Sequence, residues 1–289
     1  MILAHTDPKH IQRLARRLSS FSDVFIHIDS SVDIELFKEG LNDLNVYFLE
    51  KRFHCEWGGG GNAVEAEIAL LEFAQKNKRY ERFVFLQGAD YPIKSNQYIQ
   101  QFYEKNINVE YIRACNCTLS DDPYFYEKCR YYLYPNHRNL IKKVHDKVIR
   151  YFRICLKNGK IYDGKMTYDV FWGTAQWSIT GDFAEYVVAF FRNNPEFNRW
   201  FLHSFPADEL YFCTVIMNSE FRERTLSGGP EPARRGLANW RNLHYFEYSD
   251  SVRIFTDSDY QLLKNCKELY ARKVNTEKSK KLLDMLDDG

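Results

Sequence analysis

The chain has 289 residues, of which 45% are hydrophobic and 16% aromatic, so it is long enough to bury a sizeable core. Its formal net charge of +1 argues against a dedicated nucleic-acid-binding protein, and the absence of any apolar run of about 18 residues argues against a membrane span. Seven cysteines, with no CxxC pair and no histidines at zinc spacing, predict reduced thiols and a cytoplasmic protein.

The first third of the chain alternates short apolar runs with helical patterns. Buried strands are expected at 1–4, 24–29, 46–49 and 83–86, and helices at 9–19, 33–39 and 63–75. Asp7 and Pro8 form a start signal for the first helix, and Ser95 can cap a further one. This order predicts an α/β fold with a mostly parallel central sheet flanked by helices. We interpret residues 1–105 as a nucleotide-binding half.

Two of the predicted strands end in a carboxylate. The strand at 83–86 runs into Gly88 and Asp90, and the strand at 24–29 ends at Asp29. Open α/β sheets bind their ligands beside the carboxyl ends of their strands, so Asp90 is expected to lie in that crevice. The glycine loop at 58–61 precedes a helix but matches neither GxGxxG nor a Walker loop, which makes it a weak phosphate motif.

The pattern changes after about residue 105. Strands are expected at 109–112 and 252–255, an interrupted strand at 171–179, and helices at 182–192, 207–218 and 257–270. We interpret residues 106–275 as the half that carries the acceptor and the catalytic group. Residues 276–289 are expected to form a charged, frayed tail. Because no repeat or low-complexity linker interrupts the chain, residues 1–289 are expected to form a single domain.

A basic segment at 128–160 contains an amphipathic stretch at 140–156. The simpler interpretation is a solvated basic helix. The alternative is contact with an anionic acceptor, or peripheral contact with a membrane surface such as the inner membrane. The sequence pattern leaves both interpretations open.

Three places could carry charge or proton-transfer chemistry. A site for a divalent cation and a diphosphate commonly uses a D-x-D pair, whereas only Asp90 stands at the strand end here. Without a metal, cationic side chains must neutralise a diphosphate, and Arg272 and Lys273 are candidates unless they are simply solvated. Asp208 and Glu209 open a helix, where they can be capping residues or where Glu209 can be a general base.

Five stretches follow one another along the chain: FIHID at 25–29, LQGADYPIK at 86–94, GTAQWSI at 173–179, PADE at 206–209 and LYARK at 269–273. Trp57-Gly58-Gly59 and Ala66-Glu67 lie between the first two. Together these stretches resemble the core-2/I-branching β-1,6-N-acetylglucosaminyltransferase family, which includes the peptide O-xylosyltransferases. The resemblance runs from Ile2 to about Val274, and its most specific part is the G-x-D-[YF]-P-I-K element.

The resemblance implies a GT-A-type fold and an inverting, metal-independent transfer from a UDP-sugar to a glycan hydroxyl. It implies that Glu209 deprotonates the acceptor hydroxyl and that Lys273 binds the diphosphate in place of a cation. Asp29 and Trp57 would lie beside the uridine. The residues expected to face the acceptor sugar are Glu110, Gly173, Thr174, Ala175 and Trp240.

The chain departs from the family pattern in two places. The second basic residue on the diphosphate falls near Asp250, so Arg253 or Arg272 is expected to replace it, or else Arg234 or Arg235. The Trp57 loop is one residue longer than usual. Asp90, as a lone carboxylate, is expected to order the site or to bind a sugar hydroxyl.

The sequence thus predicts a cytoplasmic glycosyltransferase that builds a surface polysaccharide or a similar glycan. It is similar to the soluble bacterial relatives, because the Golgi members carry a stem and an anchor that are not expected here. N-acetylglucosamine is the expected donor sugar and xylose the second candidate. The alternative from another class is an inactive relative that binds a nucleotide sugar or a glycan without turnover. A hydrolase is disfavoured because no nucleophile elbow is present.

Overall fold

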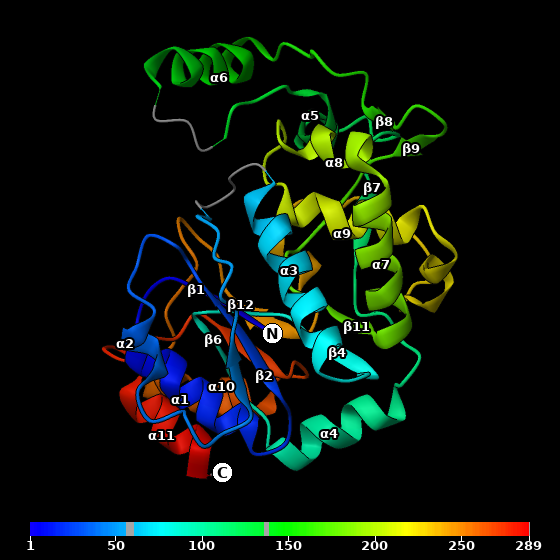
Figure 1. Cartoon of the computed structure of the whole chain (residues 1–289). Helices are drawn as coiled ribbons and strands as arrows, with labels where there is room; N and C mark the ends of the chain where they lie inside the picture. Colours follow the sequence, from blue (N-terminus) through cyan, green and yellow to red (C-terminus); the bar gives the residue numbers. More distant parts are fainter. Residues whose placement is uncertain (56–60, 136–138, 289) are drawn as a thin grey trace.

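A computed structural model describes residues 1–55, 61–135 and 139–288 of the chain (Figure 1). Trp57 and Gly58 to Gly60 of the predicted glycine loop lie outside these ranges. Four parallel strands form the central sheet in the order β3-β2-β1-β5. They are β1 (Ile2–Ala4), β2 (Val24–Ile28), β3 (Val46–Phe48) and β5 (Leu86–Gln87), joined by α1 (Pro8–Ser19), α2 (Glu35–Lys38) and α3 (Asn62–Asn77). The predicted α/β fold with a parallel central sheet is confirmed.

The central sheet lies between two apolar clusters. Ile26 and Ile28 of β2 belong to the cluster that contains Leu14 of α1, whereas Phe25 belongs to the cluster that contains Val64 and Ile68 of α3. Successive side chains of a strand point to opposite faces of its sheet. The continuous apolar run of β2 is therefore explained by burial on both faces.

The predicted helix starts at Asp7 and Ser95 are confirmed. The Asp7 carboxylate accepts a hydrogen bond of 3.2 Å from the backbone N–H of His10 at the start of α1. The Ser95 hydroxyl accepts one of 3.2 Å from Tyr98 at the start of α4 (Asn96–Lys105). Both side chains satisfy backbone donors that have no partner inside the first turn of a helix.

The single strand expected at 83–86 is wrong, because two short strands take its place. β4 (Arg82–Val84) pairs antiparallel with β11 (Ser178–Thr180), and β5 pairs parallel with β1. The Phe85 N–H donates to the carbonyl of Trp177 at 3.0 Å, and the Leu86 N–H donates to that of Met1 at 2.9 Å. The chain changes partners between these two residues, which an apolar run does not signal.

Residues 106–275 add helices and short strand pairs beside α3 (Figure 1). These elements are β7 (Ala114–Asn116), α5 (Pro123–Arg130), α6 (Leu140–Phe152), β8 (Lys160–Tyr162), β9 (Thr167–Asp169), β10 (Phe171–Gly173), α7 (Gly181–Asn193), α8 (Pro195–Phe201), α9 (Asp208–Met217), and the 3₁₀ helices Glu220–Arg224 and Leu237–Trp240. The interrupted strand is confirmed, since β10 ends at Gly173 and β11 begins at Ser178. The strand expected at 109–112 is wrong: Glu110 and Tyr111 form isolated bridges, and β7 pairs with β10 instead.

Residues near the carboxyl terminus complete a second, three-stranded sheet. It consists of β12 (His244–Phe246), β13 (Tyr270–Arg272) and β6 (Asp90–Pro92), in that order. The helix expected at 257–270 is therefore corrected: a 3₁₀ turn (Asp257–Asp259) leads into α10 (Tyr260–Asn265), and Tyr270 lies in the central strand. The strand expected at 252–255 is also wrong, because Val252 forms only an isolated bridge with Tyr248.

The charged tail is a helix and not a frayed end. In α11 (Lys280–Asp288), Leu282, Leu283 and Leu286 are buried. Arg13 of α1 forms ion pairs with Asp284 and Asp287 on the same helix. The high charge of the segment concealed three leucines at helical spacing, and their burial against the sheet cluster orders it.

Candidate active site

At the carboxyl edge of the central sheet, Asp29 lies beside the end of β1, and so does the turn that leads to Asp90. The Asp29 N–H donates to the carbonyl of Ala4 at 2.9 Å, so the end of β2 lies directly beside the end of β1. Gly88 follows β5 on the other side of β1, where a Cβ on Gly88 would lie 2.9 Å from the Cβ of Ala4. Glycine therefore permits the close approach of the β5 turn to β1. The parallel order of the strands thus brings Asp29 and the Gly88 turn to one edge of the sheet, and ligand binding there stays a prediction.

Asp29 organises the loop that leads toward the glycine segment. Its buried carboxylate accepts hydrogen bonds from the backbone N–H groups of Ser31 (2.8 Å) and Cys55 (2.6 Å) and lies 3.0 Å from Nδ1 of His54. Burial would raise the pKa of Asp29, but these hydrogen bonds outweigh it and hold the pKa well below its usual range. Asp29 is thus an anion that fixes the backbone at Ser31 and Cys55, and its predicted uridine contact stays a prediction.

Asp90 is fully buried at the start of β6. Its carboxylate receives hydrogen bonds from Arg272 (2.8 Å) and from the Gln87 N–H (2.7 Å), and Nε2 of His244 lies 3.3 Å away. Burial acts to raise the pKa of Asp90, yet the opposing charges of Arg272 and His244 lower it to about 2. Asp90 therefore ties β6 to β13, and its expected role in ordering the site or binding a sugar hydroxyl stays a prediction.

Lys273 and the two candidate arginines differ in their partners. Arg272 is paired with Asp90, and Arg253 is paired with Glu247 and Asp259. The Lys273 ammonium has no hydrogen bond or ion pair within the described ranges, and it is half-buried. Burial and the neighbouring Arg272 charge lower the pKa of Lys273. Of these three cations, Lys273 is the one whose charge is left for a ligand.

Glu209 lies in the first turn of α9, where the helix dipole favours a negative charge. Its Oε2 accepts a hydrogen bond of 2.7 Å from Nε1 of Trp172, and its side chain keeps some exposed surface. Burial raises the pKa of Glu209 to about 7, and the charge of Asp208 adds to this rise, whereas Lys128 and the Trp172 hydrogen bond oppose it. A carboxylate with a pKa near neutrality is suited to accept a proton.

Aromatic and cationic side chains that the sequence reasoning did not single out surround Glu209. Nζ of Lys128 on α5 lies 4.6 Å from the centre of a Trp172 ring and 4.8 Å from that of Tyr124. Trp172 also packs edge-on against Trp240, with 5.3 Å between ring centres. Trp172 directly precedes the predicted acceptor segment, and this position was the one sequence signal that could have identified it.

Other carboxylates lie close to Glu209. Burial raises the pKa of Asp208, and burial together with the Asp208 charge raises that of Glu67, which accepts a 2.9 Å hydrogen bond from Trp177. Burial, together with the charges of Asp29, Glu67 and Asp208, raises the pKa of the Cys55 thiol. In the described part of the chain, no group of three or more His, Cys, Asp or Glu side chains could hold a metal ion.

Two of the predicted acceptor residues have clear structural roles. The buried Glu110 carboxylate accepts hydrogen bonds from the backbone N–H and the hydroxyl of Thr180, the residue that caps α7. A Cβ on Gly173 would lie 2.0 Å from the carbonyl oxygen of Arg113, so this position on β10 requires glycine. Contacts of Glu110 and Gly173 with a sugar stay predictions.

The remaining predicted acceptor residues lie near Trp172. Ala175 is buried and Thr174 half-buried between β10 and β11. Trp240 is buried, and its Nε1 donates a hydrogen bond of 2.7 Å to the carbonyl of Arg234. Through its contact with Trp172, Trp240 is the predicted acceptor residue that the structure links most directly to Glu209.

The amino-acid sequence matches a protein-family model over most of its length. The model described as "Core-2/I-Branching enzyme" matches residues 1–264. The chain belongs to the core-2/I-branching enzyme family. The protein is therefore a glycosyltransferase of the core-2/I-branching type with a GT-A-like fold. A comparison with curated protein sequences gave no match.

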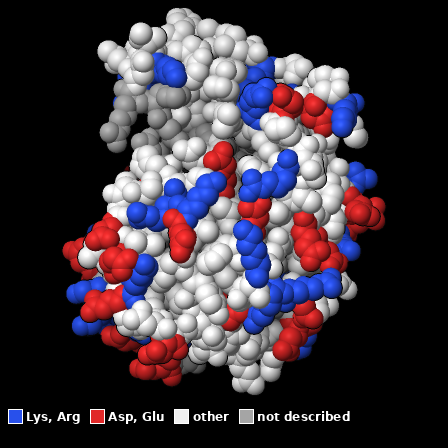
Figure 2. All heavy atoms as spheres, viewed as in Figure 1, with Lys and Arg blue, Asp and Glu red and all other residues white. Residues whose placement is uncertain are grey.

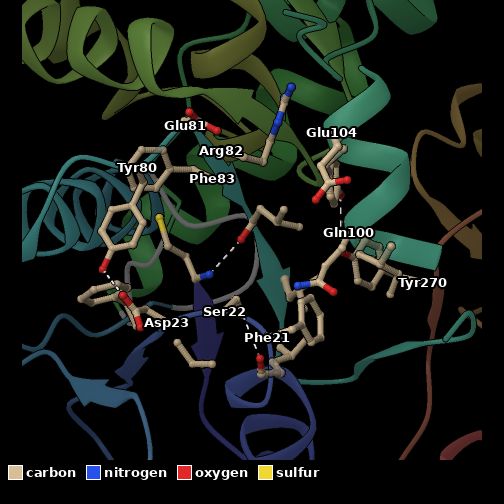
Figure 3. A pocket seen from close by; sticks show the side chains of 18 of the residues that line it. Phe21, Ser22, Asp23, Tyr80, Glu81, Arg82, Phe83, Gln100, Glu104 and Tyr270 are labelled. Carbon is tan, nitrogen blue, oxygen red and sulfur yellow. Dashed lines mark hydrogen bonds between the residues drawn. The ribbon is translucent and has the colours of Figure 1, made fainter. Parts of the chain in front are cut away.

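The protein also has a cavity of about 430 Å³ at the opposite, amino edge of the sheet (Figure 3). Its lining includes Phe21, Tyr80, Arg82 and Tyr270, and the Tyr80 hydroxyl donates to Asp23 at 2.5 Å. None of the described residues predicted for the active site lines this cavity. The parallel order of the strands separates it from the carboxyl edge that carries the candidate active site.

Proposed function

We propose that this enzyme transfers a sugar from a UDP-sugar to a glycan hydroxyl, with inversion at the anomeric carbon and without a divalent metal. N-acetylglucosamine is the first candidate donor sugar and xylose the second. The glycan belongs to a surface polysaccharide or a similar product. The observation that carries the proposal is the geometry of Glu209, a partly exposed carboxylate with a pKa near neutrality in a family of glycosyltransferases.

In this proposal Glu209 is the general base. It takes the proton from the acceptor hydroxyl while the hydroxyl oxygen bonds to the anomeric carbon of the donor. The bond between that carbon and the diphosphate oxygen breaks from the opposite side, and UDP leaves with the electron pair. The hydrogen bond from Trp172 would hold Oε2 in place, which keeps the carboxylate aligned for proton transfer.

Lys273 is proposed to neutralise the charge that develops on the leaving diphosphate. Its support is the half-buried ammonium that is without an ion pair in the described ranges, close to the Gly88 turn. The Val274 N–H donates to the carbonyl of Ala89 at 2.9 Å, which attaches the end of β13 to that turn. This bond anchors the backbone beside Lys273, and a cation that already lies in the site stabilises a leaving group with little reorganisation during the reaction.

Asp29 and Trp57 remain our proposed uridine neighbours, and Glu110, Trp240 and the 173–175 backbone our proposed acceptor neighbours. Asp29 would act by ordering Ser31 and Cys55, since its carboxylate already accepts hydrogen bonds from their backbone N–H groups. Arg272 and Arg253 are proposed as weaker contributors to diphosphate binding, because both are paired with carboxylates of the chain.

The proposal is tested by incubating the protein with UDP-N-acetylglucosamine and a β-galactoside acceptor and measuring released UDP. Thermal-shift measurements with UDP, GDP and CDP provide the binding control. Stabilisation by UDP together with UDP release supports a transferase. Stabilisation without release from any UDP-sugar would favour the alternative, an inactive binding relative. Indifference to all UDP-sugars would refute both.

A further inference from the structure

Helix α6 presents apolar side chains to solvent on the face that points away from the rest of the molecule. The side chains on this face, which we call the α6 outer face, have the following exposed fractions: Leu140 74%, Ile141 78%, Val144 52%, Val148 41%, Tyr151 81% and Phe152 66%. With about 3.6 residues per turn, all six fall on one side of the helix. An ordinary surface helix buries its apolar side, so this arrangement is the reverse of the usual one.

The opposite side of α6 is attached to the protein, which fixes the orientation of the helix. Ile149 is buried in a small cluster with Tyr131 and Leu133. The Asp146 carboxylate accepts a hydrogen bond of 3.0 Å from the Tyr134 N–H, and Nζ of Lys142 lies 4.9 Å from the centre of the Tyr134 ring. These contacts fix the orientation of α6, so the helix cannot rotate to bury the α6 outer face.

Positive charges border the α6 outer face. Lys143, Lys147 and Arg150 are exposed along one flank of the helix. The one acidic residue between 140 and 157 is Asp146, which is turned toward Tyr134. In Figure 2 the surface at the upper left, where α6 lies, is mostly uncharged with a basic group visible, whereas basic and acidic groups are intermixed over the rest of this face. Apolar side chains beside lysines and arginines are the chemistry that binds the surface of an anionic bilayer.

We propose that α6 docks this enzyme on an anionic lipid surface, with the α6 outer face inserted among the lipids and its basic flank on the headgroups. None of the helices described by the structure combines the length and the apolar character that crossing a bilayer requires. A second copy of the chain fits the α6 outer face less well. An antiparallel two-fold contact between two such helices would place their basic flanks on the same side of the contact, where they repel.

The attachment of α6 connects this surface to the candidate active site. The guanidinium of Arg150 lies 4.9 Å from the centre of the Phe205 ring, and Phe205 begins the short segment that leads into Asp208 and Glu209. Lys157, which follows α6, donates to the carbonyl of His203 at 2.9 Å. This one step rests on the proposed function, in which Glu209 is the general base. Docking then holds the Glu209 carboxylate near the lipid surface. The acceptor glycan is then one carried by a membrane lipid.

The test is co-sedimentation of the full chain with vesicles, which requires no catalytic activity. Vesicles of phosphatidylcholine with phosphatidylglycerol should bind the protein, and vesicles of phosphatidylcholine alone should not. The double variant Ile141→Ser/Phe152→Ser should lower the partition coefficient by about tenfold or more, because it removes apolar area from the inserted face. The matched control Leu36→Ser/Leu226→Ser, which changes two exposed leucines elsewhere, should bind as the wild type does.

Further double variants test how the basic flank of α6 contributes to vesicle binding. Lys143→Glu/Lys147→Glu should weaken binding to the anionic vesicles and reduce its salt dependence, whereas Lys280→Glu/Lys281→Glu on α11 should not. Equal binding by wild type and Ile141→Ser/Phe152→Ser overturns the proposal, as does a wild-type protein that ignores anionic vesicles. A dimer in light scattering that Ile141→Ser/Phe152→Ser converts to a monomer, with no vesicle binding, assigns the face to a second copy instead. Vesicle binding by a protein that releases no UDP would refute the proposed function and leave the docking intact.

Discussion

The indole N–H of Trp172 donates a hydrogen bond of 2.7 Å to Oε2 of Glu209. Trp172 reaches Glu209 from β10, across the packing of β10 against α9, so two segments 37 residues apart set the position of one carboxylate. In the described residues Oε1 accepts no hydrogen bond. One oxygen is thus held by the protein, and in the proposed mechanism the other takes the proton of the acceptor hydroxyl. The predictions below follow from this arrangement and its neighbours.

Replacing Glu209 by glutamine should abolish transfer while leaving UDP binding nearly intact. Glutamine keeps the shape of the side chain and can accept the Trp172 hydrogen bond, but it cannot take up a proton. General bases contribute roughly 10²–10⁴-fold, so kcat should fall by that factor. Released UDP gives the rate, and titration calorimetry gives the UDP affinity. Glu104→Gln, at an exposed position, is the control; transfer by Glu209→Gln within about tenfold of wild type would exclude Glu209 as the base.

The pH profile should depend on the charges beside Glu209. The base must be ionised, so kcat/KM should fall below about pH 7, where Glu209 becomes protonated. Lys128→Met removes a positive charge that lowers the pKa of Glu209, so its acidic limb should move to higher pH. Asp208→Asn removes a negative charge that raises that pKa, so its limb should move to lower pH. Shifts of both variants in the same direction would contradict this assignment of charges.

Glu209→Gln should also make the fold more stable at alkaline pH. In the wild type, burial raises the pKa of Glu209 from 4.5 to about 7. The protonated carboxyl therefore supports folding fully below about pH 4.5, and this support is lost as the pH rises through about 7. Glutamine does not titrate. The variant should exceed the wild type in free energy of unfolding by about 1–3 kcal/mol at pH 8, with the difference closing toward pH 5. Urea denaturation at several pH values measures the free energy of unfolding of both proteins. A difference between them that does not change with pH would argue against a raised pKa of Glu209.

Substitutions of the neighbours Lys273 and Arg272 should affect different properties of the protein. The first should weaken UDP binding, and the second should lower stability. Lys273→Met should reduce UDP affinity by about tenfold or more, since a charge-assisted contact is lost, with little change in stability. Arg272→Met leaves the buried Asp90 carboxylate without its guanidinium and should cost about 3–5 kcal/mol of stability. Thermal unfolding and UDP titration separate the two effects. A Lys273→Met protein that binds UDP as tightly as wild type would remove Lys273 from the diphosphate site.

Activity should survive removal of divalent metal. The reason is the single carboxylate, Asp90, at the strand end where a metal site would use a pair, and Asp90 is already bonded to Arg272. UDP release measured after dialysis against EDTA should equal that of the untreated protein. Complete loss in EDTA that manganese restores would show that the transfer depends on metal.

Sequence patterns were informative wherever the determining interactions are local. Asp7 and Ser95 were predicted as helix caps because a cap requires only a side chain and the first turn that follows it. The parallel sheet followed from the alternation of strands and helices, and the α6 helix from its periodicity. The G-x-D-[YF]-P-I-K element at 88–94 pointed to the family because its residue types and spacing are specific.

Only the tertiary structure decided which partners the elements find. The same apolar residues at 83–86 serve two sheets because Phe85 and Leu86 bond to different strands. Leu282 and its neighbours make the charged tail helical because a buried surface is available to them. Asp90 pairs with Arg272 and Glu209 with Trp172 across 182 and 37 residues of chain. Burial and electrostatic fields act through space, so the charge state of Glu209 and the outward apolar face of α6 could not be derived from spacing along the chain.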